Sequence, residues 1–553
     1  MTIHTMSTLF RYLTHSALWL SLASAAAAQA SSPFEGVMPF QPLSSHDTYL
    51  LEMDGTISHT WPGTHAPGQA IYLNDAGNLV RTIKTNSFNG GAGGGIQEVA
   101  DDGTTIWEFI YDDPTHLSHH DIALMPNGNI LMIAWEFMTS NDAVDAGRNP
   151  NLVAGSTFAA DSVIEIAPNG TGGADIVWEW RVWDHIIQDY DADKPNYGAI
   201  DQHPELINLN YPPTVPGQGD WNHINSIDYN ADLDQILLSS HGQDEIWIID
   251  HSTTTAEAAG HSGGDQGRGG DLLYRWGNPR AYRHGAPSQR KLFGQHDAQW
   301  IADGLSGAGD ILLFNNGAGR PAGQFSTIDQ FTPPLDASGG YSYTAGTAYG
   351  PTALSWSYTD PNPNDFYSGF ISGCQRLPGG TTLVCSGGQG WFFEVDDAGT
   401  LIWEYFTSNT FKIRRYGTCD APTTYCSTAP NSAGSGALIG SSGSTNISVG
   451  DFALSVTDAP ANTPGIFYFG TGQASVPFGD GFRCATGTLS RLSVLFTDAS
   501  GSGIYPLDFT DASSPAGSLS AGDTRYFQFW FRDNAFGGVG YNLSDGLSVT
   551  LCN

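Results

Sequence analysis

The segment Trp221–Asp250, WNHINSIDYNADLDQILLSSHGQDEIWIID, predicts two strands joined by a polar turn. His223 and Asn225 stand two apart in the first strand, and residues two apart point to the same side, so both should share one face. The return strand ends in LLSS followed by His241, which brings a second imidazole to the same end of the hairpin. This set of polar side chains at one strand end indicates more than core packing.

Two further hairpins repeat this design. The sequence HHDIALMPNGNILMIAWE places His120 ahead of a Pro-Asn-Gly turn and a return strand. The sequence QHDAQWIADGLSGAGDILLFNNG places His296 ahead of a glycine-rich turn and another return strand. A related hairpin, FISGCQRLPGGTTLVCSGG, has Ser372 near the position of the histidine. Because three hairpins begin with a histidine, we expect these side chains to form one constellation.

A second type of hairpin recurs between them, in which an Asp-Gly or Asn-Gly type of turn leads into a strand that contains Trp-Glu or ends in Trp. The examples are YLLEMDGTISHTW, IQEVADDGTTIWEF, VIEIAPNGTGGADIVWEW and WFFEVDDAGTLIWEY. Alternating apolar positions around such turns are typical of β-hairpins. Two hairpins make a four-stranded sheet, and sheets that recur along a chain predict the blades of a β-propeller. Residues from Asp47 to about Tyr416 leave room for six blades.

Composition agrees with an all-β fold, because glycine is abundant, at 68 of 553 residues, and helical periodicity is nearly absent. We predict a signal peptide over residues 1–30, since Arg11 precedes an apolar run that ends at Ala28-Gln29-Ala30. A six-bladed β-propeller over residues 31–426 follows. A small, polar linker over 427–445 then leads to an accessory β-sandwich over 446–553.

The net charge of −35 argues against nucleic acid or an anionic membrane as partner, because both would repel the chain. The predicted signal peptide indicates a secreted or periplasmic protein, and no apolar run of the sequence is long enough for a membrane span. Five cations precede His296, namely Arg275, Arg280, Arg283, Arg290 and Lys291. They form either an anion site or a solvated loop.

Six cysteines in an exported chain favour disulfides, and no Cys-x-x-Cys spacing supports a zinc site. We predict three pairs: Cys374 with Cys385, Cys419 with Cys426, and Cys484 with Cys552.

The order of several motifs resembles that of the bacterial arylsulfotransferases, the exported, PAPS-independent kind. The motifs are HHDIALMPNGNIL, NHINSIDYN, EIWIIDHSTTTAEAAGH, LLYRWGNP, QHDAQWI and ILLFNNG, and the resemblance covers roughly residues 47–420. It implies a six-bladed propeller with the active site at the mouth of its channel. It also implies transfer of a sulfuryl group from an aryl sulfate ester to a phenolic acceptor through a sulfated histidine, without a cofactor.

The resemblance assigns roles to four residues by motif. His296 in QHDAQW matches the histidine that becomes sulfated. His223 and Asn225 match the pair that binds the sulfuryl oxygens, and His120 matches another histidine of that pocket. The chemistry agrees, because an imidazole held at one nitrogen is a nucleophile at the other, and neighbouring imidazoles can donate to developing charge.

The closing segment FKIRRY resembles that of the family and would put Arg414 or Tyr416 near the substrate, with Ser372 also expected there. One position departs from the family pattern. An arginine usually follows the LLSS strand, whereas this chain has His241. Arginine is always charged and offers a fork of donors, so the histidine should make charge stabilisation weaker or pH-dependent.

The remaining histidines have structural interpretations. His119 should face away from His120, and Asp121 and Asp297 should point to the opposite face of their strands. We expect the others to be loop or framework residues: His116, His185, His203, His251, His261 and His284.

Three hypotheses follow. The first is a sulfotransferase, with sulfatase activity as a side reaction. The second is a metal-dependent hydrolase or lyase in which His120, His223, His241 and His296 form a metal cage. The third is a non-enzymatic extracellular propeller that binds a ligand and lost its activity when the arginine of the family pattern became His241.

Overall fold

The computed structural model describes residues 32–552, except 89, 154, 213–218, 418–421 and 448–449. The predicted signal peptide therefore lies outside the described residues. The fold is all-β, with 43% strand and 8% helix, which confirms the predicted class. The two α-helices of the described part are short, α1 at Ser140–Asp145 and α2 at Thr255–Ala258. No helix among the described residues is long and apolar enough to cross a membrane.

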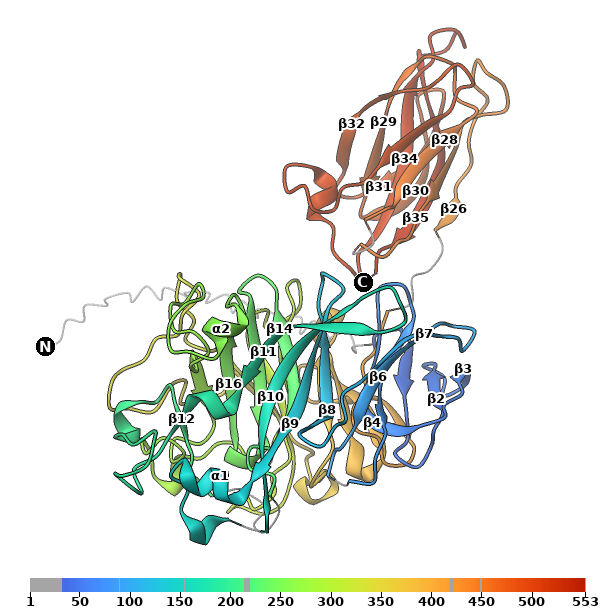
Figure 1. Cartoon of the computed structure of the whole chain (residues 1–553). Helices are drawn as coiled ribbons and strands as arrows, with labels where there is room; N and C mark the ends of the chain where they lie inside the picture. The colour runs from blue at the N-terminus through green and yellow to red at the C-terminus, as the bar shows by residue number, and fades with distance from the viewer. Residues whose placement is uncertain are drawn as a thin grey trace, which may run out of the picture. The chain divides into compact units, whose positions relative to one another are not determined.

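Small antiparallel sheets follow one another along the first three quarters of the chain (Figure 1). The first has three strands: β1 Met38–Phe40, β2 Thr48–Leu51 and β3 Ile57–Trp61. The second contains β4 Ala66–Leu73, β5 Leu79–Lys84, β6 Gly94–Val99 and β7 Thr105–Ile110. The third contains β8 His116–Leu124, β9 Ile130–Thr139, β10 Thr157–Pro168 and β11 Ala174–Arg181. Each sheet is a series of hairpins in chain order, as the turn signals predict.

Three further four-stranded sheets continue the series. They contain β14 Ile224–Asn230, β15 Gln235–Ser240, β16 Glu245–Asp250 and β17 Tyr274–Trp276; then β18 His296–Trp300, β19 Ile311–Asn315, β20 Thr327–Phe331 and β21 Trp356–Tyr358; then β22 Gly373–Arg376, β23 Thr382–Ser386, β24 Trp391–Val395 and β25 Leu401–Phe406. A short parallel pair, β12 Ile186–Ile187 and β13 Ile207–Asn208, lies in the insertion before β14.

The first strands of neighbouring sheets contact one another. Strand β8 contacts β4 and β14, β14 contacts β18, and β18 contacts β22. The chain then returns to its first sheet: the Val37 N–H donates to the Tyr416 carbonyl at 2.8 Å, and the Tyr416 N–H donates back at 2.9 Å. The strands that carry the predicted site, β8, β14 and β18, therefore lie next to one another. The number of propeller blades stays a prediction.

Tryptophans of the repeated hairpins link one sheet to the next. The Trp61 indole of β3 donates to the carbonyl of Ala100, in the β6–β7 turn, at 3.1 Å. The Trp403 indole of β25 donates to the carbonyl of Met53, in the β2–β3 turn, at 2.9 Å. The second bond joins the last of these sheets to the first, so the repeated tryptophans hold the series together.

The C-terminal strands form two facing sheets. One contains β26 Thr423–Tyr425, β35 Tyr541–Thr550, β34 Thr524–Arg532, β29 Pro464–Gly470 and β32 Ser490–Phe496. The other contains β27 Leu438–Ser442, β28 Ala453–Thr457 and β33 Gly503–Pro506, and β30 Gly472–Phe478 pairs with β31 Gly481–Thr486. Leu454 and Val456 of one sheet pack in the same core as Phe467 and Phe529 of the other. A core shared by two sheets is the arrangement of a β-sandwich.

The predicted linker over 427–445 is corrected by the structure. It contains β27, which pairs along its length with β28, and β26 even earlier in the chain pairs with β35. Strand β27 buries Ile439 but leaves Leu438 and Ser442 exposed. Its small and polar residues therefore resemble a linker although they form a sheet edge.

The predicted disulfides of the C-terminal part are wrong. Cys426 is bonded to Cys484, with Cα atoms 6.0 Å apart. This bond excludes both Cys419–Cys426 and Cys484–Cys552, and Cys419 itself lies outside the described residues. Cys552 is also disulfide-bonded. The error arose because sequence neighbours were paired, whereas the sandwich brings β31 against the chain that follows β26.

The predicted Cys374–Cys385 bond is also wrong, because both thiols are free and buried. In the β22–β23 ladder Cys374 opposes Val384, and Gly373 opposes Cys385. The two cysteines are thus offset by one position, and adjacent positions point to opposite faces of a sheet. Each thiol packs in a different hydrophobic core.

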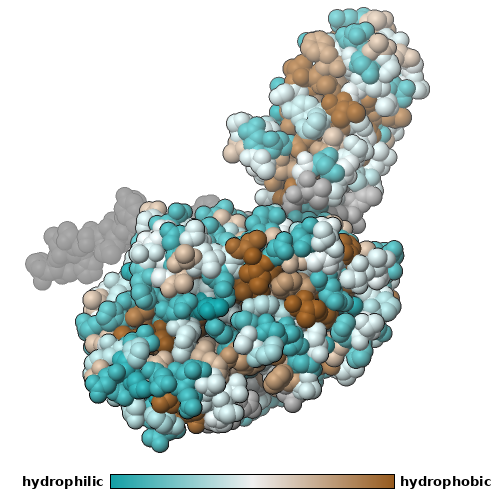
Figure 2. Space-filling view, in the orientation of Figure 1, coloured by the Kyte–Doolittle hydropathy of each residue, from teal (hydrophilic) through white to brown (hydrophobic). Residues whose placement is uncertain are grey.

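Figure 2 shows a visible face of mainly hydrophilic and intermediate colour, with separate hydrophobic groups. Exposed apolar side chains occur on the last strands of sheets, such as Ile106 and Ile110 of β7 and Ile176 and Val177 of β11. Strand β8, at the other edge of its sheet, is buried over most of its length. The predicted site therefore lies on the buried side of the sheets.

Candidate functional site

Four imidazoles lie in a row of neighbouring rings. The ring centroids are 4.6 Å apart for His120 and His223, 5.1 Å for His223 and His241, and 5.6 Å for His241 and His296. These side chains, here called the histidine row, come from β8, the residue before β14, the 3-10 turn after β15, and the first position of β18. The structure therefore brings together the four histidines that the sequence singled out.

Near the histidines, the side chains of these strands do not alternate regularly between the two faces of the sheet. His120, His223 and Asp297 adopt positive φ angles of 52°, 48° and 55°. The register of β8, β14 and β18 with the next strand shifts at the same places. Such β-bulges re-aim a side chain, and each left-handed non-glycine residue costs about 1–3 kcal/mol. The fold thus accepts backbone strain at three strand heads, which is a common feature of functional sites.

Two glycines make room for the rings. A Cβ on Gly91 would lie 2.0 Å from His120 Nε2, and one on Gly294 would lie 3.1 Å from His241 Nε2. Both glycines also have positive φ, at 90° and 69°. Any side chain at Gly91 would displace the His120 ring.

His296 is held at one nitrogen. Its Nδ1 lies 2.8 Å from Asn316 Oδ1 and 3.2 Å from the Gly294 carbonyl. The Asn316 Nδ2 donates to the Ser368 carbonyl at 2.7 Å, so the Asn316 Oδ1 faces His296 as an acceptor. The Nδ1 of His296 must therefore carry the proton, which leaves Nε2 with a lone pair. Burial lowers the pKa of His296 to about 4, although the bond to Asn316 opposes this, so the ring is neutral near pH 7.

Ser372, which was predicted to bind substrate, contacts Asn316 instead. Its Oγ accepts from Asn316 Nδ2 at 3.0 Å and is fully buried. The side chain therefore supports Asn316, which in turn orients His296. Asn316 belongs to the ILLFNNG motif and directly follows β19, the return strand that pairs with β18, but no sequence pattern indicated its role.

The surroundings of His223, in contrast, favour its protonated form. Its Nδ1 contacts Asp220 Oδ2 at 2.5 Å, and the other oxygen of Asp220 accepts from the Trp135 indole at 3.1 Å. Burial alone would lower the pKa of His223, but the charge and hydrogen bond of Asp220 outweigh burial and raise it. The pKa of Asp220 is lowered despite burial, chiefly by the charge of His223. Of the four imidazoles, His223 is therefore the one that is most readily protonated.

His120 and His241 are neutral. Burial, followed by the nearby His223, lowers the pKa of each well below the ordinary value of a histidine. His241 replaces an arginine of the family pattern, so this chain has a neutral donor where a permanent cation was expected.

His119 does not face away from the row, contrary to the prediction. Its Nδ1 lies 2.8 Å from His120 Nδ1, and its ring stacks on Trp135 with centroids 4.2 Å apart. Its Nε2 is 2.7 Å from Asp161 Oδ1, in close contact but without the alignment of a hydrogen bond. Burial lowers the pKa of His119 to about 3. The bulge in β8 explains the error, because it places two consecutive imidazoles in contact.

Asn225, predicted to share a face with His223, donates through Nδ2 to the Gln295 carbonyl at 2.8 Å. It therefore contacts the backbone of the residue before His296. The register shift next to Ile224 interrupts the alternation on which the prediction rested.

A layer of buried charges lies beside the row. The Lys412 Nζ is 2.6 Å from Asp121 Oδ2 and 3.2 Å from Asp297 Oδ1. Arg414 donates to both oxygens of Asp297, at 2.6 and 2.8 Å. Asp121 and Asp297 thus have cationic partners of their own, separate from the four imidazoles. Burial would raise the pKa of Asp297, but Arg414 and Lys412 hold it well below its usual range.

The closing segment reaches the row through an aromatic ring. The Phe411 ring lies 5.9 Å from His120 and 6.3 Å from His296 between centroids. Arg414 is engaged by Asp297, and the Tyr416 hydroxyl accepts from the Leu73 N–H at 3.0 Å. Phe411 of this segment was not predicted from the sequence, because an apolar side chain gives no chemical signal.

Comparison with known proteins gives the family. The family model Arylsulfotransferase (ASST) matches residues 81–412, more than half of the chain. The chain belongs to the arylsulfotransferase family. Membership supports aryl sulfotransferase activity on small aryl donors and acceptors. No curated protein matches the chain.

Solved structures match this arylsulfotransferase only remotely. A protein of unknown function from Bacteroides caccae is 10% identical, with a TM-score of 0.39, covering 69% of this chain and 98% of that one. A streptogramin B lyase is 11% identical, with a TM-score of 0.35 and coverage of 68% and 81%. Virginiamycin B lyase from Staphylococcus aureus is 11% identical, with a TM-score of 0.34 and coverage of 68% and 83%. Similarity at this level says nothing of activity.

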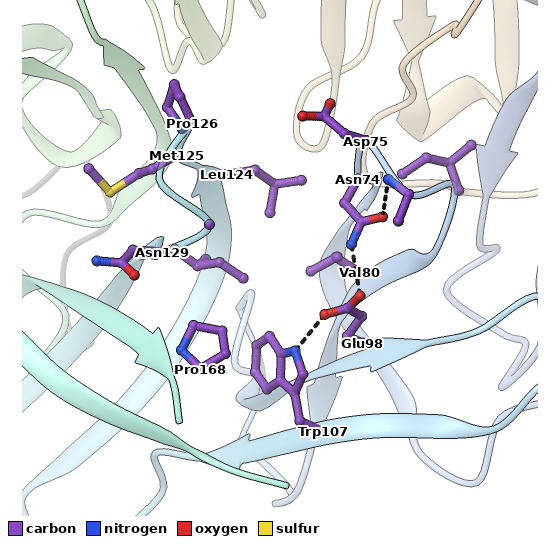
Figure 3. Close-up of a pocket in the computed structure, with 14 residues that line it drawn as sticks. Asn74, Asp75, Val80, Glu98, Trp107, Leu124, Met125, Pro126, Asn129 and Pro168 are labelled. Atoms are coloured by element: carbon purple, nitrogen blue, oxygen red, sulfur yellow. Dashed lines mark hydrogen bonds between the residues drawn. The ribbon is translucent and has the colours of Figure 1, made fainter. Parts of the chain in front are cut away.

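Two cavities of the arylsulfotransferase lie away from the histidine row. One of ≈ 190 Å³ is lined by Tyr72, Asp228, Trp300 and Arg414, among others. Another, of ≈ 590 Å³, is shown in Figure 3 between the β4–β5 and β8–β9 turns. There Glu98 accepts from Asn74 at 2.8 Å. Leu124 of this cavity lies four residues beyond the row in β8, about 13 Å along the strand.

The run of cations ahead of His296 is largely paired in this arylsulfotransferase. Arg275 is buried against Glu245, and Arg290 contacts Asp244 at 2.8 Å. Asp244 also accepts from the Gly294 N–H at 2.8 Å. These arginines therefore brace the loop that leads to β18, and neither offers a free charge for an anion.

Proposed function

We propose that this arylsulfotransferase is an exported enzyme that moves a sulfuryl group from an aryl sulfate ester to a phenol through a sulfated His296, without PAPS. The observation that carries the proposal is the contrast within one row of touching rings. His296 is neutral and held by Asn316 at Nδ1, whereas His223 is cationic through Asp220. A neutral nucleophile and a charged proton donor are the two groups that this transfer requires.

In the first step, Nε2 of His296 attacks the sulfur of the donor. The N–S bond forms while the bond between sulfur and the phenolic oxygen breaks. The departing phenolate takes the proton of cationic His223 and leaves as a phenol. The Nδ1–H of His296 stays hydrogen-bonded to Asn316 Oδ1, and the amide dipole of Asn316 stabilises the positive charge that the ring gains.

In the second step, the acceptor phenol gives its proton to the now neutral His223. The oxygen of the acceptor phenol attacks sulfur, and the N–S bond breaks. This restores neutral His296 and cationic His223. Water in place of the phenol gives a slower sulfatase side reaction. His120 and His241, both neutral, donate ring N–H groups to the sulfuryl oxygens, and Asn225 completes this clamp by fixing the backbone next to His296.

Arg414, Tyr416 and Ser372 have supporting roles in this proposal. Arg414 holds Asp297, the residue that follows the nucleophile, and Ser372 holds Asn316. Tyr416 fixes the segment that closes the first sheet.

The same proposal includes a six-bladed propeller over the sheets from β1 to β25, a C-terminal accessory domain and export to an oxidising compartment. Five four-stranded sheets, one three-stranded sheet and the return of Tyr416 to Val37 support the blade count. The Cys426–Cys484 bond supports export, because disulfides persist outside the cytoplasm. Among the described residues, the one group of ligand atoms close enough for a metal ion lies outside the row.

Steady-state kinetics with a chromogenic aryl sulfate and a phenol test the proposal. We expect ping-pong behaviour, with parallel double-reciprocal lines at several acceptor concentrations. His296→Asn should abolish turnover and keep the melting temperature within a few degrees. His284→Asn, which changes a partly exposed loop histidine, is the control and should retain activity. Intersecting lines, or an active His296→Asn variant, would refute the covalent route.

A further inference from the structure

Three potential metal ligands meet outside the histidine row. His185 ends the 3-10 turn η2, Val182–His185, while His261 and Asp271 lie within the insertion between β16 and β17. Asp271 Oδ1 lies 2.8 Å from His185 Nδ1 and 2.7 Å from His261 Nδ1. One nitrogen or oxygen from each residue lies within 4.8 Å of the others. A single carboxylate oxygen therefore faces two imidazole nitrogens.

The other ring nitrogen of His185, Nε2, is held by a backbone carbonyl. This nitrogen lies 2.8 Å from the Ala258 carbonyl, which can only accept, so Nε2 carries a proton. The ring is fully buried and stacks on Trp180 at 5.7 Å with an interplanar angle of 8°. A histidine that donates one N–H to a backbone carbonyl and turns the other nitrogen to a carboxylate has the outer contact usual for metal-bound histidines.

The chain before Asp271 packs closely against this ring. A Cβ on Gly270 would lie 2.6 Å from His185 Nε2 and 2.0 Å from the Ala258 carbonyl oxygen. The position directly before Asp271 must therefore be glycine for His185 to keep its place.

We propose that His185, His261 and Asp271 form a binding site for a divalent zinc ion, with water as the fourth ligand. In a tetrahedral site with bonds of about 2.0 Å, ligand atoms lie about 3.3 Å apart. The present separations of 2.8 and 2.7 Å need only a small outward movement. His261, whose side chain is 62% exposed, provides access from solvent, while the other two ligands are buried. The net charge of −35 favours a cation in general.

The ion would join two insertions of the chain. One ligand lies in the turn after β11, and two lie in the loop that carries α2. These segments already contact each other through the Trp180 indole, which donates to the Gly270 carbonyl at 2.7 Å. Zinc there would stabilise the folded insertions and take no part in sulfuryl transfer.

Zinc itself is the probe, added to the mature chain after removal of any polyhistidine tag. We expect the metal-stripped protein to regain one zinc per chain at this site, measured by mass spectrometry of the metal after gel filtration, and its melting temperature to rise. His261→Ala should lose this equivalent and the thermal shift, because it removes an exposed ligand without touching the core. His203→Ala is the matched control, since His203 is exposed and paired with Glu205 at 2.9 Å, and it should keep both.

Two further variants complete the test. Asp271→Asn should also lose the equivalent, and His296→Asn should retain it, which separates this site from the histidine row. Equal zinc content and equal thermal shift in the unmodified protein and His261→Ala would overturn the proposal. The three side chains would then be a hydrogen-bonded network only.

Discussion

The partner of His223 gives the most informative perturbation. Asp220→Asn keeps the shape of the side chain and an oxygen for the Trp135 indole, but removes the negative charge beside His223 Nδ1. The attraction between the two charges, about 4 Å apart at an effective dielectric constant of about 20, is about 4 kcal/mol, equivalent to roughly 3 pKa units. With its oxygen on the Trp135 indole, the amide turns its Nδ2 donor toward His223 Nδ1, a contact that only the neutral ring can accept, so we expect the pKa of His223 to fall by roughly 3 units or more.

The sign of the pH effect follows from the roles. Transfer needs cationic His223, so activity of the unmodified enzyme should decrease as pH rises through the raised pKa of His223. In Asp220→Asn this alkaline limb should move to lower pH, and activity near pH 7 should fall roughly 10²-fold. The acid limb reflects protonation of His296, whose pKa of about 4 is set chiefly by burial and only in part by His223, so this limb should move less than the alkaline limb.

The same pair has a consequence for stability. A histidine with a raised folded pKa stabilises the fold fully below its unfolded pKa of about 6.5, and this contribution disappears as pH rises through the folded pKa. For Asp220, whose folded pKa is lowered, the contribution is lost as pH falls through that pKa. Unfolding by urea at several pH values should therefore show a smaller pH dependence in Asp220→Asn.

The assay is the pH profile of kcat/KM for a chromogenic aryl sulfate with excess phenol. Asp113→Asn is the matched control, because Asp113 contacts His116 at the same spacing of three residues, at 3.1 Å, but near the surface. It should leave both limbs unchanged. If Asp220→Asn shows the same alkaline limb as the unmodified enzyme, His223 is not the cationic donor.

Two other predictions follow from buried groups. Without reductant, Cys374 and Cys385 should resist labelling in the native protein and appear as two thiols per chain after denaturation; a count of zero would restore a bond between them. Lys412→Met should reduce the free energy of unfolding by about 3–5 kcal/mol in urea titrations, because it leaves two buried carboxylates without their lysine. Lys194→Met, which breaks the more exposed pair with Asp145 at 2.8 Å, should leave the free energy of unfolding nearly unchanged, and equal losses in both variants would contradict this reasoning.

The regular features of the fold could be predicted from sequence because they depend on local rules. Turns such as Asp54-Gly55 and Asp102-Gly103 fix the hairpins, and alternation around them fixes which faces are buried. The C-terminal pairings could not be predicted in this way. The bond between Cys426 and Cys484 joins residues 58 apart, and only the packing of the sandwich brings them together.

The candidate site, too, could be predicted from the sequence only in part. The strand heads with histidine were visible in the sequence, since three hairpins repeat them. Their supporting residues were not, because bulges at His120 and His223 change which neighbours meet. Asp220 and Asn316 act across turns or between sheets, and no periodicity marks them. His185 and His261 were assigned to the framework because they are 76 residues apart and meet only through Asp271.

The central claim is that the sulfuryl group passes through His296, and a donor-only incubation tests it directly. The protein is mixed with aryl sulfate in the absence of acceptor, digested at a pH that preserves N–S bonds, and mapped by peptide mass spectrometry. We predict one added sulfuryl group per chain, on the peptide that contains His296, and its disappearance when phenol is added. An adduct on a different residue, or no adduct during active turnover, would contradict the account.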